Sequence, residues 1–234
     1  MSIPYFKKAL LLNDLDPDIT YNYANSLLSI DKFDQTIKLL QRTLELDCKY
    51  EKAYYTLGLT YQKLGEYGKA LNNFDEAINL NEKYHDAHFA KSTILLILGD
   101  YENGWKEYYH RWDAKNELKR PCYNVKWWNG EDLKGKRILV QQEQGFGDNI
   151  QFVRFVPLLY SLGATVYLAV KDELYDLFES LDNINLVRDK DNVDNVDYFT
   201  SLMELPRLLY DQSNQFITSK KYLNSKNNST DILI

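Results

Sequence analysis

Apolar residues in the first half of the chain recur at the spacing of amphipathic helices, and the whole pattern repeats every 34 residues. When residues 51–84 are placed over their neighbours at this offset, Tyr67 falls on Phe33 and Tyr101. A repeated apolar phase of this kind predicts a stack of helix pairs, because no pair buries its apolar face alone. We expect a leading helix at 3–13 and further helices at 19–30, 33–46, 51–64, 67–80, 84–98 and 101–115.

Small and aromatic residues occupy fixed places within this period. Gly58 and Ala70 suit positions where two helices cross closely, and Phe74 suits the space between them. Together with Leu57, Tyr61 and Ala77, these residues resemble the tetratricopeptide repeat. The third copy departs from the pattern in its second helix, where Gly104 and Trp105 stand.

The resemblance implies a concave inner surface, formed by the first helix of each pair, that binds an extended peptide of a protein partner. Aromatic residues at such positions also serve as packing between repeats, and this second interpretation stays open. The residues expected to face the groove are Tyr21, Asn25, Tyr55, Leu59, Gln62, Phe89 and Thr93.

The period ends near residue 116, and the pattern after it changes. Residues 117–136 contain a proline, two glycines and paired tryptophans, which indicates a connector. We expect Trp112, Trp127 and Trp128 to cap the last repeat against the next domain.

From residue 137 to 211, short β-branched runs alternate with helical patterns, which predicts a parallel sheet with helices on its faces. The runs RILVQQ, TVYLAV, INLVRD and VDYFT are expected to be strands. The segments GDNIQFVRFVPLLYSLG, DELYDLFESL and SLMELPRLLY are expected to be helices.

The loop after the first of these strands carries candidate chemistry. Gly145 and Gly147 permit positive φ and close approach of a ligand to the backbone, and Asp148 stands in the first turn of the next helix. A helix amino-terminus of this kind can hold a diphosphate. Because Asn149 and Ile150 follow where a dinucleotide fingerprint needs its third glycine, the alternative is a plain turn in which Asp148 caps the helix.

The segments LGDYENGWKEYYHRW and WWNGEDLKGKRILVQQEQGFGDNIQFVRFVPLLYSLGATVYLAV resemble bacterial proteins that join tetratricopeptide repeats to a glycosyltransferase-like domain. That domain is related to heptosyltransferases and O-linked N-acetylglucosamine transferases. The resemblance implies a Rossmann-like sheet, the amino-terminal half of a GT-B fold, with Asp148 as catalytic base. It also implies acceptor contacts from Glu143, Gln144, Gly145, Gly147 and Asn149.

The donor-binding half of such an enzyme has no counterpart in residues 1–234. The expected division is a repeat array at 1–116, a connector at 117–136, a Rossmann-like half-domain at 137–211 and a polar tail at 212–234. Two functions follow as alternatives. One is part of a transferase, which needs a second polypeptide to complete it before it takes a nucleotide sugar, and the other is a non-catalytic scaffold that uses the repeat groove.

Composition narrows these choices further. A net charge of −6 argues against a general nucleic-acid binder, and no run reaches the length of a membrane span, so we expect a cytoplasmic protein. Cys48 and Cys122 lie far apart and are expected to be reduced thiols. Since the histidines do not combine with cysteine at zinc spacings, the sequence predicts no metal and no cofactor.

Overall fold

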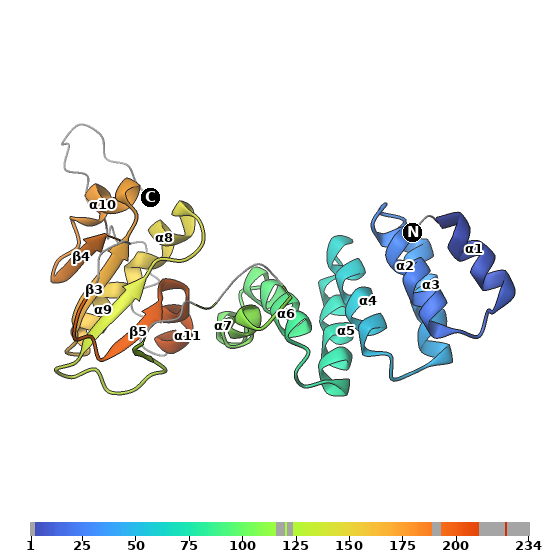
Figure 1. Ribbon diagram of the computed structural model, residues 1–234, viewed down its shortest axis with the longest axis horizontal. Coiled ribbons are helices and arrows are strands. Elements are labelled where there is room, and N and C mark those ends of the chain that lie inside the picture. Colours follow the sequence, from blue (N-terminus) through green and yellow to red (C-terminus); the bar gives the residue numbers. More distant parts are fainter. Residues whose placement is uncertain (1–2, 116–119, 121–123, 189–192, 211–222, 224–234) are drawn as a thin grey trace. The chain divides into compact units, whose positions relative to one another are not determined.

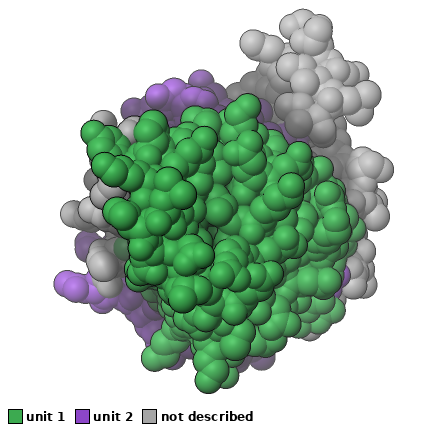
Figure 2. Space-filling model, turned by 90° about the vertical axis from the view of Figure 1, so that its right-hand side faces the viewer, with its two compact units in different colours: residues 1–120 green, residues 121–234 purple. Residues whose placement is uncertain are grey.

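The computed structural model describes residues 3–115, 120, 124–188, 193–210 and 223 of the chain. The chain divides into two compact units, residues 1–120 and residues 121–234. Figure 1 shows the elements of each, and Figure 2 colours the two units separately. Of the helices in the described ranges, none has both the length and the apolar character needed to cross a membrane.

The first unit, which we call the repeat unit, consists of helices that each pack on the next one in the chain (Figure 1). The predicted helices are confirmed, with bounds that shift by one or two residues at most ends. The last helix is shorter than predicted and closes in a 3₁₀ turn. The elements are α1 (Ile3–Leu12), α2 (Pro17–Leu28), α3 (Phe33–Leu46), α4 (Glu51–Lys63), α5 (Tyr67–Leu80), α6 (His85–Ile97), α7 (Tyr101–Tyr108) and η1 (Tyr109–Trp112).

The turn inside each helix pair is the same in all three repeats. Asp31, Gly65 and Gly99, spaced 34 residues apart, all take positive φ, at 56°, 74° and 83°. In each case the next backbone N–H returns to the last turn of the preceding helix, as from Glu66 to the Tyr61 carbonyl at 2.9 Å. This is the left-handed C-terminal motif that favours glycine, so the 34-residue period extends to single backbone hydrogen bonds.

The core of the middle repeat depends on one close approach. A Cβ built on Gly58 of α4 would lie 2.4 Å from Cε1 of Phe74 on α5, which is far inside van der Waals contact. Phe74 is fully buried, as are Ala70 and Ala77 on the same helix. In the third repeat the position of Ala77 is taken by Arg111, which is also fully buried. Its guanidinium stacks on the Trp112 ring at 4.2 Å.

The second unit, which we call the sheet unit, is built on a five-stranded sheet in the order β1-β5-β2-β3-β4 (Figure 1). All four neighbouring pairs run parallel, as the alternating pattern predicted. Leu139, Ala169 and Phe199 form a buried apolar cluster on one face of the sheet. The strands are β1 (Lys126–Trp127), β2 (Arg137–Gln141), β3 (Thr165–Val170), β4 (Ile184–Arg188) and β5 (Tyr198–Ser201).

The helix expected after the first strand is not continuous. It is divided by a 3₁₀ turn, and Pro157 stands in the first turn of the last piece, where its missing N–H costs nothing. The helical elements of this unit are α8 (Phe146–Phe152), η2 (Val153–Phe155), α9 (Val156–Ser161), α10 (Asp172–Phe178), η3 (Leu202–Glu204) and α11 (Leu205–Leu208).

The segment expected as a connector contributes to the sheet. β1 lies within it and pairs with β5, in the register Trp127 to Phe199. Trp128 is 2% exposed, and its indole N–H donates to the Glu131 carbonyl at 2.9 Å. These two tryptophans therefore pack in the sheet unit, which corrects their expected role as caps of the repeats. The polar tail expected at 212–234 lies outside the described residues except for residue 223.

Candidate functional site

The residues expected to face the repeat groove lie on the first helices of successive repeats. α4 contacts both α2 and α6, so these three helices form one continuous wall. Tyr21, Tyr55 and Phe89 occupy the same place in their repeats, one after another along this wall. All seven predicted groove residues are half-buried, so each one has packing contacts and also some surface open to solvent.

Each aromatic residue of the wall is paired with a second ring. Tyr21 lies 5.0 Å from Tyr50, and Tyr55 lies 5.1 Å from Tyr84, measured between ring centroids. Tyr50 and Tyr84 are themselves 34 residues apart, at the residue before α4 and before α6. In the third repeat Phe89 meets Tyr108 at 5.6 Å. We call the two repeating pairs the tyrosine ladder; the sequence analysis missed Tyr50 and Tyr84, although their shared phase was the available signal.

Carboxylates accompany the tyrosine ladder. The Tyr50 hydroxyl donates to Oδ1 of Asp18 at 2.6 Å. Burial, followed by the charge of Asp86, raises the pKa of Tyr55 to about 12. Burial and the surrounding phenols and carboxylates also raise the pKa of Tyr84. The ladder therefore stays neutral at physiological pH and presents hydroxyl groups beside acidic side chains.

Polar residues continue the same wall. Nε2 of Gln62 donates to Oγ1 of Thr93 at 3.0 Å, which links α4 with α6. Asn25 of α2 lines a hollow of about 830 Å³ between α1 and α2. Its other lining residues are Ile3, Pro4, Phe6, Asn22, Ser26, Ser29 and Ile30.

The loop after β2 is the second candidate site. Oδ2 of Asp148 accepts from the Gly145 N–H at 3.2 Å, so this carboxylate closes the first turn of α8 as a capping residue. Gly145 has φ −83°, and Gly147 lies in α8, so neither glycine adopts the positive φ that the sequence analysis gave them. Gln144 takes that conformation instead, at φ 68°.

The remaining residues of this loop are tied to the loop or to the next strand. Asn149 is fully buried, and its amide bridges the Glu143 N–H at 3.1 Å and the Gly145 carbonyl at 2.8 Å. The Glu143 carboxylate accepts from the Ser201 hydroxyl at the end of β5. In the part of the sheet unit that the structure describes, the buried amide of Gln142 has no hydrogen-bond partner. The structure thus brings Glu143, Gly145, Asp148 and Asn149 together, at the carboxyl edge of the sheet.

A third cluster was not expected from the sequence. His88 on α6 contacts Glu107 on α7, with Nδ1 and Oε2 2.5 Å apart, and the rings of His88 and His110 stack at 3.9 Å. Burial opposes protonation of His88, but the hydrogen bond and charge of Glu107 outweigh it and raise the pKa of His88. Burial and the charge of His88 lower the pKa of His110.

Comparison with known proteins supports the repeat architecture. A family model described as tetratricopeptide repeat matches residues 51–84. Protein FlbA from Caulobacter vibrioides is 32% identical over 178 residues, which cover 73% of this chain and 28% of FlbA. Uncharacterized protein MJ0572 from Methanocaldococcus jannaschii is 33% identical over 81 residues, or 35% of this chain and 94% of that protein. A crystal structure of MamA aligns at 25% identity with a TM-score of 0.45, covering 47% of this chain and 65% of MamA.

Two consequences follow from these matches. The aligned region of FlbA is longer than the repeat unit, so the similarity continues into the sheet unit, while this chain spans under a third of FlbA. The match at residues 51–84, together with turns and helix pairs that recur every 34 residues, places this chain among the tetratricopeptide-repeat proteins.

Proposed function

We propose that the repeat unit is a protein-interaction module whose inner wall binds an extended segment of a partner protein. The observation that carries this proposal is the tyrosine ladder, in which half-exposed phenols repeat along one wall beside carboxylates. Tyrosine gives large contact area at low conformational cost and is enriched at binding hot spots.

The charge around the ladder narrows the class of partner. Asp18, Glu51 and Asp86 act on the hydroxyls of the ladder tyrosines, and Lys52 is the basic residue at the place that Asp18 and Asp86 hold in their repeats. A segment with arginine or lysine side chains would stack its cations on the phenol rings and pair with these carboxylates. We infer that the partner segment is extended and basic.

Binding to this wall is testable without knowing the partner. A displayed library of random peptides, selected on the intact chain, is expected to be enriched in arginine and lysine. For a selected peptide, fluorescence polarisation should show at least tenfold weaker binding to Tyr55→Ala, which is about 1.4 kcal/mol. The reason is that this substitution removes both a ring and a hydroxyl from the middle of the wall.

Tyr101→Ala is the matched control, because Tyr101 is a half-exposed tyrosine on α7, the second helix of its repeat. It should bind the peptide as the unchanged protein does. Circular dichroism at 222 nm verifies that each variant is folded. Equal affinity of Tyr55→Ala and the unchanged protein, or a selection that yields no basic peptides, would contradict the proposal.

A glycosyltransferase-like role of the sheet unit is the second candidate. β2 leads through β3 to β4 on one side, and β5 then returns to the other side of β2. Ligands of open parallel sheets bind where the strand order reverses in this way, outside the carboxyl ends of the strands. Glu143 and Ser201 stand at this place, and the FlbA alignment extends into the same unit. A donor-binding domain would have to come from a longer chain or a second polypeptide.

This candidate has its own test. Titration with UDP-N-acetylglucosamine to millimolar concentration, followed by calorimetry, should give a saturable heat that Ser201→Ala reduces. Asp148→Asn keeps an oxygen that can accept from the Gly145 N–H, so it should leave α8 intact and remove a catalytic base. If no nucleotide sugar gives a saturable heat, the sheet unit alone is not a donor site and the scaffold role stands.

A further inference from the structure

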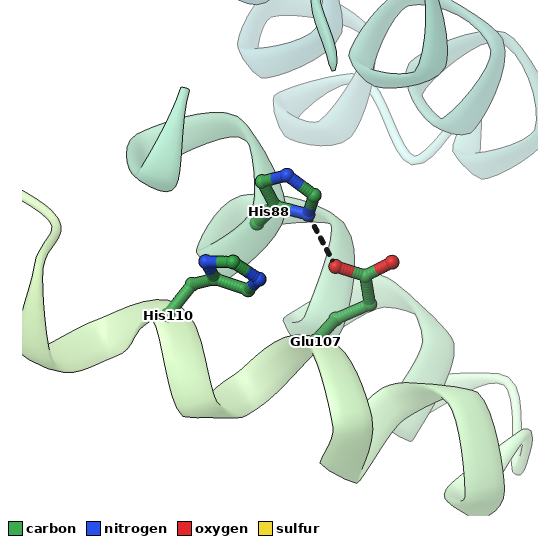
Figure 3. A group of neighbouring side chains, drawn as sticks. All are labelled: His88, Glu107 and His110. Carbon is green, nitrogen blue, oxygen red and sulfur yellow. Dashed lines mark hydrogen bonds and ion pairs between the residues drawn. The ribbon is translucent and has the colours of Figure 1, made fainter. Parts of the chain in front are cut away.

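All three histidines of this chain meet at one place, between α6 and the end of α7 (Figure 3). His85 and His88 stand three residues apart in the first turns of α6. Glu107 and His110 are also three residues apart, at the end of α7 and in η1. Residues at this spacing share one face of a helix, so the two short pairs point at each other across the helix contact.

The side chains are close enough to bind one ion together. One ligand atom from each of His88, Glu107 and His110 lies within 4.8 Å of the others. Figure 3 shows a ring nitrogen of His110 turned towards the Glu107 carboxylate, which also contacts His88. Donors on a tetrahedral zinc ion are about 3.3 Å apart, as bonds of about 2.1 Å require, so His88 and Glu107 need to separate by less than about 1 Å.

Both imidazoles have a partner for a second nitrogen, as histidine ligands of metals do. Nε2 of His88 lies 3.1 Å from the Glu82 carbonyl, to which it donates. Nδ1 of His110 lies 2.9 Å from Nδ1 of His85. A neutral His88 that donates from Nε2 presents the lone pair of Nδ1 to the Glu107 carboxylate. Two electron pairs that face each other need a cation between them, and that cation is either a proton or a metal ion.

Exposure and charge of the cluster fit a site that an ion can reach. The side chain of His88 is 12% exposed and that of Glu107 is 21% exposed. Lys91 is the basic neighbour, and its ammonium lies 2.7 Å from Asp75 but 3.5 Å from Glu107. Because Asp75 holds this lysine more closely, Glu107 keeps its second oxygen available to a cation.

We propose that His88, Glu107 and His110 bind a divalent first-row transition metal ion, for which Zn²⁺ is the probe. Two imidazoles and a carboxylate are a ligand set that suits zinc and its neighbours. Solvent takes the fourth position. His85 and the Glu82 carbonyl orient the two rings. The ion joins α6 to α7 and η1, and thereby strengthens the last helix pair of the array.

The composition of the chain makes the experiment clean. The protein, freed of any polyhistidine tag and stripped with a chelator, is titrated with Zn²⁺ in a calorimeter. One ion per chain is expected, together with a higher melting temperature, because the ion binds the folded state preferentially. His110→Gln should weaken Zn²⁺ binding at least about tenfold, since it removes one of three ligands.

Two further variants distinguish the cluster from other sites. Glu107→Gln keeps the shape of the side chain and removes its charge, and it should also weaken Zn²⁺ binding if His110→Gln proves unstable. Cys48→Ser is the control, because Cys48 is the exposed thiol outside the cluster in the described part of the chain, and it should leave the affinity unchanged.

Nuclear magnetic resonance of the ring nitrogens identifies the ligands directly, because the chain has only three imidazoles. Zn²⁺ should shift nitrogens of His88 and His110 in stoichiometric proportion. Three results would overturn the proposal: no saturable Zn²⁺ binding, equal affinity of His110→Gln and the unchanged protein, or ring resonances that do not respond to a full equivalent. In each case the His88–Glu107 contact is an ion pair that holds two helices together.

Discussion

Replacing Gly58 with alanine is expected to destabilise the repeat unit by about 1–3 kcal/mol, although alanine is the better helix former. The new Cβ would meet the Phe74 ring at 2.4 Å and 2.5 Å, at Cε1 and Cδ1. Phe74 is fully buried, so its ring cannot swing into solvent to relieve the contact. Urea unfolding followed by circular dichroism measures the loss.

Gly68→Ala is the matched control for this prediction. Gly68 lies in the first turn of α5, and a Cβ there would meet nothing within 4 Å. The same substitution should therefore stabilise the unit by about 0.5–1 kcal/mol, through helix propensity alone. Combining Gly58→Ala with Phe74→Leu should cost less than the sum of the two single changes, because the smaller side chain vacates part of the contact. Additive costs would show that the crossing at Gly58 is not what limits this position.

Trp128→Ala is expected to cost the sheet unit about 3–5 kcal/mol, the range for emptying a buried tryptophan site. The indole is 2% exposed, and the backbone N–H of Trp128 donates to the Phe199 carbonyl of β5 at 2.7 Å. Loss of the side chain removes packing beside the short strand β1 and the hydrogen bond to Glu131. Amide hydrogen exchange read by mass spectrometry reports the two units separately.

The expected pattern is local to the sheet unit. Amides of β2 and β3 should exchange about 100-fold faster or more, which corresponds to the lower end of that cost, while α4 and α5 keep their protection. Trp128→Phe retains most of the apolar volume and should cost less than half as much. Faster exchange in α6 and α7 instead would mean that Trp128 serves the repeats, as the sequence alone had indicated.

The groove and the β2 loop respond differently to sequence reasoning. The groove residues could be placed because a helical phase, once found, fixes which side chains share a face. Asp148 was placed correctly in the first turn of its helix, but two interpretations of it were open. The contact with the Gly145 N–H shows that the capping role is realised in the structure, and a catalytic role remains a prediction.

The sequence by itself determined the elements whose signals are local. The helices, the left-handed turns at Gly65 and Gly99, and the main strands follow from periodicity and backbone preference within a few residues. Tertiary structure decided the pairings of residues that lie far apart in the chain. β1 pairs with a strand more than 70 residues later, and His88 meets His110 from another helix. Such contacts depend on how helices and strands pack in three dimensions, and no spacing along the chain records them.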